Sequence, residues 1–306
     1  MEDDRRQVAG WRWTADRVGA HWRWGRTQGW ARLVEEDQLD PRERLRVWAT
    51  KTAWRRRHGL SPGEGVPVLV VGLQRSGTNM LVRGLEQLPQ VEVHNENDRR
   101  VFRRFRVVDD ELARTCRQSR SAYVLFKPLC DSHRTPELLG RAGAGKALAV
   151  WIYRDVDGRV RSSVAKFGAS NRQALVTIAR GGATTWQAGG LSDSDEELVR
   201  SLDPEQLDPI SASALFWYLR NSLYFSTGLA ARQDVHLTSY DAFLDDPEQT
   251  TRRLCSFLDT PYQTRMTAHM AQRQNGSTAR LKIDLRVREL CEELQTRLEA
   301  ARTSGR

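Results

Sequence analysis

The sequence predicts an α/β fold in which a central, mostly parallel sheet lies between two layers of helices, a three-layer α/β/α arrangement. Four short, continuous apolar runs are typical of strands that are covered on both faces. Longer stretches of helical character separate these runs along the chain. This alternation is typical of parallel sheets, which bind their ligands at the carboxyl ends of the strands.

The predicted strands and helices follow one another from residue 66 onward. The strands are the runs VPVLVV, AYVLF, ALAVWIY and VHLTS, at residues 66–71, 122–126, 147–153 and 235–239. The helices are expected at residues 78–88, 136–142, 156–167, 211–229 and 247–258. A helical crossover between strands is the connection that parallel pairing requires.

A Trp- and Arg-rich helical extension, residues 1–64, is predicted to precede a main domain at residues 65–306. The extension holds seven of the ten tryptophans and ends in the turn-forming sequence SPGEG. Residues 41–58 predict an amphipathic helix with Leu45, Trp48 and Ala49 on one face. Two interpretations stay open: the tryptophans pack the extension onto the main domain, or Trp22 and Trp24 stack on a sugar or base or dock a partner.

Composition narrows the possible partners. A formal net charge of +9 suits a small polyanionic substrate as well as a nucleic acid, so no nucleic-acid partner is predicted from charge. The four cysteines are far apart and fit neither a zinc site nor a disulfide framework, which favours a cytoplasmic location. No apolar run approaches the ~18 residues of a membrane-spanning helix, so no stable membrane insertion is expected.

The stretch VLVVGLQRSGTNML, residues 68–81, passes from a predicted strand through a glycine-rich turn into a helix. Backbone amides and the positive helix end predict an anion-binding, P-loop-type site there. A nucleotide-hydrolysing loop carries a lysine and then a hydroxyl residue at positions that Thr78 and Asn79 occupy here. Magnesium-dependent phosphoryl transfer is therefore disfavoured, and a bare strand-to-helix turn stays the alternative.

A second strand-to-helix segment, WIYRDVDGRVRSSVAKFG at residues 151–168, carries Arg154 at the strand end and Ser162 eight residues later. The combination of QRSGT after one strand and RDxxxxxxS after a later one resembles the sulfotransferases that use 3′-phosphoadenosine 5′-phosphosulfate (PAPS). The residues alone leave another possibility open, in which Arg154 pairs with Asp155 or Asp157 and Ser162 is simply exposed.

The resemblance implies a role for each matching residue. The 5′-phosphosulfate is expected to be held by Arg75, Ser76, Gly77, Thr78 and Asn79. The 3′-phosphate is expected to be held by Arg154 and Ser162, with Lys166 as a further basic contact.

Two later stretches also resemble this family, so that the resemblance covers residues 66–282. TSYDAFLDDPEQTTRRLCSFLD, residues 238–259, is similar to a segment whose tyrosine, here Tyr240, lines the nucleotide pocket. A tyrosine that merely packs at a strand end is the alternative. NGSTARLK, residues 275–282, lies where the family closes a polar loop over the cofactor, which implies contacts from Ser277, Thr278 and Arg280. Many cytosolic members have a tryptophan that stacks on adenine at the position that Met80 occupies here.

Sulfuryl transfer to a hydroxyl needs a base that accepts the proton of the attacking group. Cytosolic small-molecule members carry a histidine two positions after a lysine, but Leu129 stands two positions after Lys127. SGTNMLVRGLEQLPQVEVHNEND instead resembles the tyrosylprotein and carbohydrate branch, whose glutamate base matches Glu96. Glu96 is thus the expected base, with His94 and His133 in reserve. A surface glutamate that balances neighbouring arginines is the alternative.

The sequence therefore predicts a PAPS-dependent O-sulfotransferase that requires no metal. Arg75 is expected to meet the charge that develops on the bridging oxygen, in place of the absent lysine. The resemblance implies that Lys127 is a second cation near the transferred group. A P-loop small-molecule kinase and a non-catalytic nucleotide-binding interaction protein are the alternatives.

The acceptor is defined only as a small-molecule or glycan hydroxyl, of a natural product, a glycan or a lipid precursor. Residues 168–212 are expected to form helices and an acceptor-side lid. Within it, Trp186 and Gln187 either stack on and hydrogen-bond the acceptor or pack as ordinary side chains.

Overall fold

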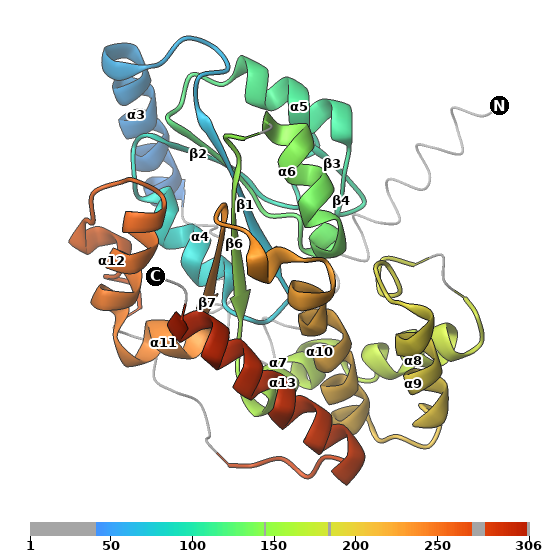
Figure 1. Cartoon of the computed structure of the whole chain (residues 1–306). Coiled ribbons are helices and arrows are strands. Elements are labelled where there is room, and N and C mark those ends of the chain that lie inside the picture. Colours follow the sequence, from blue (N-terminus) through green and yellow to red (C-terminus); the bar gives the residue numbers. More distant parts are fainter. Residues whose placement is uncertain (1–40, 144, 183–184, 271–278, 305–306) are drawn as a thin grey trace, which may run out of the picture. The chain divides into compact units, whose positions relative to one another are not determined.

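The computed structural model describes residues 41–143, 145–182, 185–270 and 279–304, with only the backbone of residues 41–44 (Figure 1). The chain divides into two compact units, Met1–Ala53 and Trp54–Arg306. Helix α3 (Pro41–His58) confirms the helix predicted there. Trp22 and Trp24 lie outside the described residues, so both interpretations of them stay predictions, as does the boundary at residue 64.

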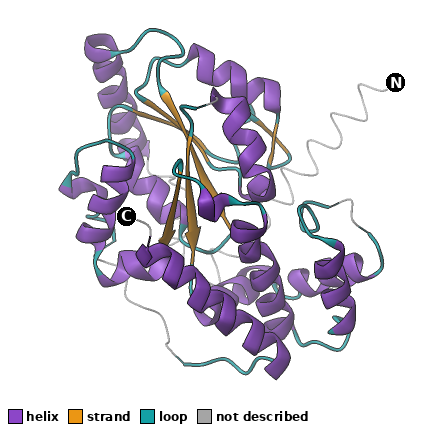
Figure 2. Cartoon of the chain, in the orientation of Figure 1, coloured by secondary structure: helices purple, strands orange, loops and turns teal. Residues whose placement is uncertain are grey.

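A five-stranded parallel sheet forms the centre of the second unit (Figure 2). Its strands, in spatial order, are β2 (Val91–His94), β5 (Tyr123–Phe126), β1 (Val66–Gly72), β6 (Leu148–Tyr153) and β7 (Val235–Ser239). The predicted parallel sheet is confirmed. Because β2 and β5 lie on one side of β1 and β6 and β7 on the other, the carboxyl end of β1 is a topological switch point.

Alternating side chains of β1 enter two separate cores, one on each face of the sheet. Leu69 and Val71 pack into a core shared with α5 (Asp109–Gln118), α6 (Thr135–Gly143), α7 (Val156–Phe167), α8 (Ser170–Ala179), α9 (Asp193–Ser201), α10 (Pro209–Ser226) and α13 (Leu285–Ser304). Val68 and Val70 pack against α4 (Thr78–Glu86), α11 (Tyr240–Asp245) and α12 (Pro247–Phe257). The three-layer prediction is thus confirmed.

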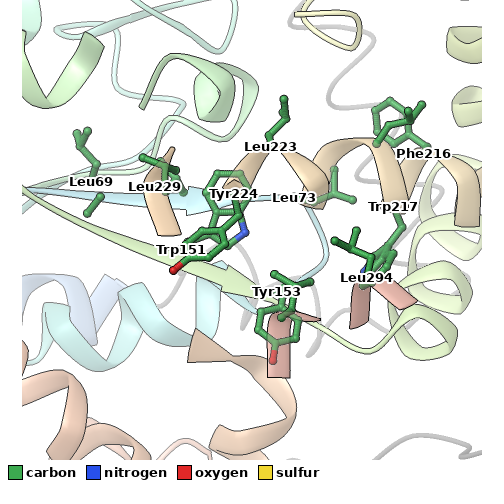
Figure 3. Packing of buried hydrophobic residues seen from close by; sticks show 14 of the residues in the cluster. Leu69, Leu73, Trp151, Tyr153, Phe216, Trp217, Leu223, Tyr224, Leu229 and Leu294 are labelled. Carbon is green, nitrogen blue, oxygen red and sulfur yellow. The ribbon is translucent and has the colours of Figure 1, made fainter. Parts of the chain in front are cut away.

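The first core is rich in large aromatic side chains. Figure 3 shows Trp151 and Tyr153 of β6 beside Trp217 and Tyr224 of α10 and Leu294 of α13. These side chains pack α10 and α13 against the sheet, and the start of α7 is tied to α13 by the Val156 amide, which donates to Gln295 Oε1 at 3.1 Å. The Tyr153 hydroxyl donates to Glu299 Oε1 of α13 at 2.5 Å, which satisfies its polar end.

Several elements differ from the prediction. Helix α10 begins at Pro209 because Asp208 caps it, accepting hydrogen bonds from the amides of Ile210 and Ser211. It ends at Ser226, shortly before Gly228, whose φ of 75° is left-handed. The shorter elements not predicted are the hairpin β3 (Phe102–Arg103) and β4 (Arg106–Val107) and the 3₁₀ turns η1 (Leu129–Arg134), η2 (Leu229–Ala231) and η3 (Thr264–Met266). No helix in the described part of the chain combines the length and apolar character that crossing a membrane requires.

Candidate functional site

Five of the predicted site residues follow the five strands at their carboxyl ends. Lys127, Arg154 and Tyr240 come directly after β5, β6 and β7. Arg75 lies in the loop after β1, and Glu96 comes two residues after β2. Since all five strands are parallel, these ends lie along one edge of the sheet, in the order Glu96, Lys127, Arg75, Arg154, Tyr240.

The loop between β1 and α4 has the backbone that a tight strand-to-helix turn requires. Arg75 has a φ of 71° and Gly77, at the start of α4, a φ of 89°, both left-handed. The first turn of α4 contains no acidic residue, so its free amides keep their positive potential. A Cβ atom at Gly77 would lie 2.3 Å from Tyr240 Cδ2, so the loop rests directly on the Tyr240 ring.

We expect Gly77→Ala to destabilise the protein by more than about 2 kcal/mol, because it adds a left-handed alanine and displaces the Tyr240 ring. Gly228→Ala is the matched control: its φ is 75°, but no described atom lies within 4 Å of the added Cβ. It should cost only about 1 kcal/mol. Urea denaturation measures both. Equal losses would show that Gly77 is needed only for its backbone angle.

The two predicted anion-binding segments meet at a side-chain contact. Arg75 Nε donates to Ser162 Oγ of α7 at 2.9 Å. Ser162 is therefore not simply exposed on its helix. The contact joins the loop after β1 to the helix after β6, although 87 residues separate them in the chain.

Arg159 is a further candidate site residue, which the sequence analysis missed. Its guanidinium is fully buried, donates to Ser213 O and Oγ of α10 at 3.1 and 3.0 Å, and reaches Gln74 O of the loop at 3.4 Å. Burial, and then the charge of Arg75, lowers its pKa to about 9, so it stays cationic at neutral pH. Its spacing, three residues before Ser162 on the same face of α7, was the available signal.

Arg154 lies over the Tyr240 ring, with the guanidinium carbon 4.4 Å from the ring centroid. A Cβ at Gly158 would lie 2.4 Å from Asp155 Oδ2 and 2.9 Å from Arg154 Nη2, so a larger residue there would displace both side chains. Arg154 Nε is 3.6 Å from Asp155, an ion-pair distance, while Asp155 mainly caps α7 through the Gly158 amide at 2.6 Å. Asp157 instead pairs with Arg288.

Lys127 links the loop to the expected base. Its Nζ donates to Asn79 Oδ1 at 2.7 Å and lies 3.8 Å from Glu96 Oε2. Burial raises the pKa of Glu96 to about 7, against the lowering effects of the Lys127 charge and the Leu129 backbone; Asp131 adds to the rise. A carboxylate that titrates near neutrality beside a buried cation suits a general base.

The two reserve histidines lie in different surroundings. His94 is 1% exposed, and its Nδ1 is 2.8 Å from Asp98 Oδ2. His133 packs against Gly189 and Gly190, and burial, together with the charges of nearby arginines, lowers its pKa to about 4.

Two of the remaining predicted contacts, Lys166 and Arg280, are exposed. Lys166 is exposed on α7, one turn after Ser162. Arg280 forms an exposed ion pair with Glu292 of α13. Ser277 and Thr278 lie outside the described residues. Within the described residues, no group of His, Cys, Asp and Glu side chains could hold a metal ion.

The expected lid contains α8 and α9 and carries Trp186 and Gln187. The Trp186 ring packs edge-on against Phe216 of α10, with centroids 6.0 Å apart. Arg220 Nη1 donates to the backbone oxygens of Gln187 and Gly189 at 3.3 and 2.6 Å. These contacts hold the segment against α10.

No protein-family model and no curated protein matches the chain. Similar solved structures include a sulfotransferase domain of the curacin biosynthetic pathway, with 14% identity, a TM-score of 0.41 and coverage of 69% of this chain and 79% of that chain. A sulfotransferase from Alicyclobacillus acidocaldarius has 16% identity, a TM-score of 0.45 and coverage of 77% and 95%. The sulfotransferase domain of the Synechococcus PCC 7002 olefin synthase has 11% identity, a TM-score of 0.40 and coverage of 78% and 98%. All three are sulfotransferases. The functional assignment of this chain depends on the residues at the carboxyl edge of its own sheet.

Proposed function

We propose that the protein is a PAPS-dependent O-sulfotransferase, with Glu96 as base and a small-molecule or glycan hydroxyl as acceptor. The observation that carries the proposal is the meeting of the two anion-binding segments, through Arg75 and Ser162, beside the pair of Lys127 and Glu96. One end of the edge thus offers cations for a phosphorylated nucleotide, and the other offers a base.

The side chains of the edge fit a polyanionic nucleotide. Ser76 Oγ and Arg154 Nε are buried and hydrogen-bond to no other described atom, so both can bind a ligand oxygen. Residues 75–79 would hold the 5′-phosphosulfate, and Arg154 and Ser162 the 3′-phosphate. Met80 is fully buried in the core, so the adenine ring needs another contact. When bound, PAPS supplies a sulfuryl group attached to a phosphate that can leave.

The chain's own groups then have distinct tasks. Glu96 accepts the proton of the acceptor hydroxyl. Lys127, held by Asn79, keeps positive charge beside that carboxylate and next to the loop. Arg75 donates to the oxygen on which negative charge develops, which stabilises the transition state more than the ground state. The acceptor is proposed to approach from the side of β2 and β5, with Trp186 and Gln187 of residues 168–212 as its proposed contacts.

Titration with 3′-phosphoadenosine 5′-phosphate (PAP), AMP and ATP, each with and without magnesium, tests the nucleotide assignment. We expect PAP to bind more tightly than AMP by about 100-fold, independently of magnesium, because a charge-assisted phosphate contact contributes about 3 kcal/mol. Arg154→Ala should abolish this preference. Arg252→Ala is the matched control, since Arg252 also lies over a tyrosine ring, Tyr262, at 4.3 Å, but on α12. Equal affinities for PAP and AMP would refute the 3′-phosphate site.

A further inference from the structure

His94 lies on the strand that precedes the proposed base and contacts the strand that precedes its lysine. It is the last residue of β2, and its ring stacks on Phe126 of β5, with centroids 5.1 Å apart and planes 17° apart. Phe126 is its partner in the β2–β5 register and directly precedes Lys127. The backbone oxygen of His94 accepts a hydrogen bond from the Lys127 amide at 3.2 Å. His94 therefore lies where Glu96 and Lys127 are brought together.

One nitrogen of the His94 ring holds the turn that contains Glu96. Nδ1 lies 2.8 Å from Asp98 Oδ2. Burial acts to raise the pKa of Asp98, but hydrogen bonds from Arg100 and His94 hold it at about 2, so Asp98 is a carboxylate and only accepts. Nδ1 must then donate. The Asp98 amide donates to Asn95 O at 2.7 Å and so closes the turn on either side of Glu96.

The other nitrogen makes no hydrogen bond with a described residue and lies beside a second carboxylate. Nε2 is 3.3 Å from Glu92 Oε1. Glu92 is itself fixed, because its Oε2 accepts from Ser119 Oγ at 2.7 Å. The ring is thus held by Asp98 and by its stack on Phe126, next to Glu92, with 1% of its surface exposed. It cannot meet an acceptor, but it can define the position of its neighbours.

We infer that His94 is a positioning residue: by holding Asp98 it holds the turn on which Glu96 lies beside Lys127. The inference rests on the proposed role of Glu96 as base. Small displacements of a base from its reacting proton are costly, since about 1 Å can reduce the rate about 100-fold. The groups that face Glu96 are Lys127, Asp131 and the Leu129 backbone, all at or after the end of β5, so the turn after β2 decides whether Glu96 remains among them.

Three substitutions of His94 test the roles of its two ring nitrogens separately. The amide of asparagine reaches about as far as Nδ1, so His94→Asn keeps a donor for Asp98. The amide of glutamine reaches about as far as Nε2, so His94→Gln loses that donor, and His94→Leu loses both. His236→Leu is the matched control, because His236 also lies on a strand and stacks on a phenylalanine, Phe257, at 5.2 Å, on β7.

The readout is the pH at which Glu96 is half protonated in the folded protein. The unfolding free energy of each protein and of its Glu96→Gln counterpart is measured from pH 4 to 8. The pH dependence of the difference between the two gives this midpoint. We expect a midpoint of about 7 in the wild type, in His94→Asn and in His236→Leu. In His94→Gln and His94→Leu, the released turn lets Glu96 reach solvent, and the midpoint should fall toward 4.5. PAP release from PAPS should fall about 10- to 100-fold in these two variants, with KM for PAPS unchanged.

Equal midpoints in His94→Asn and His94→Gln would overturn the inference. These two variants test the positioning role even if His94→Leu does not fold. The midpoint needs no turnover, so the result is separate from the proposed function. Wild-type turnover by Glu96→Gln would remove the base role, whereas an unshifted midpoint in His94→Gln would remove only the positioning role.

Discussion

Glu96→Gln is expected to reduce sulfuryl transfer at least about 100-fold while PAP binding survives, because glutamine fills the same space but cannot accept a proton. The side chain lies beside Lys127 and outside the loop at residues 75–79, so the nucleotide contacts should persist. PAP release from PAPS measures turnover, and calorimetry measures PAP affinity. Glu137→Gln, which replaces a carboxylate paired with Arg134, is the control and should keep full turnover. Wild-type turnover by Glu96→Gln would return the base role to another residue.

The same substitution should stabilise the protein above neutral pH. The pKa of Glu96 is about 7 when folded against an ordinary value of 4.5, so both states are protonated below pH 4.5 and no difference arises there. Between pH 4.5 and 7 the folded wild type loses stability as pH rises, by up to about 3 kcal/mol. Glu96→Gln lacks this loss and should be more stable at pH 8 but not at pH 4. Over the same range, wild-type turnover should rise with pH as Glu96 loses its proton.

Lys127→Met is expected to lower turnover about 100- to 1000-fold and to move the pH–rate profile to higher pH. The charge of Lys127 lowers the pKa of Glu96, so its removal raises that pKa above about 7 and a higher pH is needed to form the base. Asn79 also loses its hydrogen-bond donor at 2.7 Å.

Lys146→Met is the control for this second variant. Lys146 contacts the backbone oxygens of Gly63 and Glu64 at an exposed position, so its loss should change neither rate nor profile. The measurement is kcat for PAP release between pH 5.5 and 9. A profile in Lys127→Met that stays in place or moves to lower pH would contradict the proposed pairing of Lys127 with Glu96.

Sequence patterns predicted those parts of the fold in which local signals and burial agree. The run that forms β1 is apolar throughout because both of its faces are covered, and Gly77 is needed where the chain turns left-handed. Helix α13 was missed although its buried residues recur at helical spacing, at Val287, Cys291, Leu294 and Leu298.

The geometry of the site could not be predicted from the sequence in the same way, because it depends on pairing between strands that are far apart in the chain. Thirty-one positions separate Glu96 from Lys127, and only the β2–β5 register brings them within 3.8 Å. The spacing of Arg159 before Ser162 places it on the matching face of α7, but only the folded chain shows that α10 buries it against Ser213. Likewise, histidine is a common general base, but the burial of His94 between Asp98 and Glu92 is visible only in the folded chain.

The strand order also divides the proposed site into two parts. The proposed nucleotide contacts follow β6 and β7, whereas the proposed base and lysine follow β2 and β5, with the loop of β1 between them. Loops at the ends of strands can vary without disturbing the sheet that carries them. Under the proposed function, a change in the loops after β2 and β5 would alter the acceptor end of the site, a change after β6 and β7 would alter the nucleotide end, and Arg75 lies between the two.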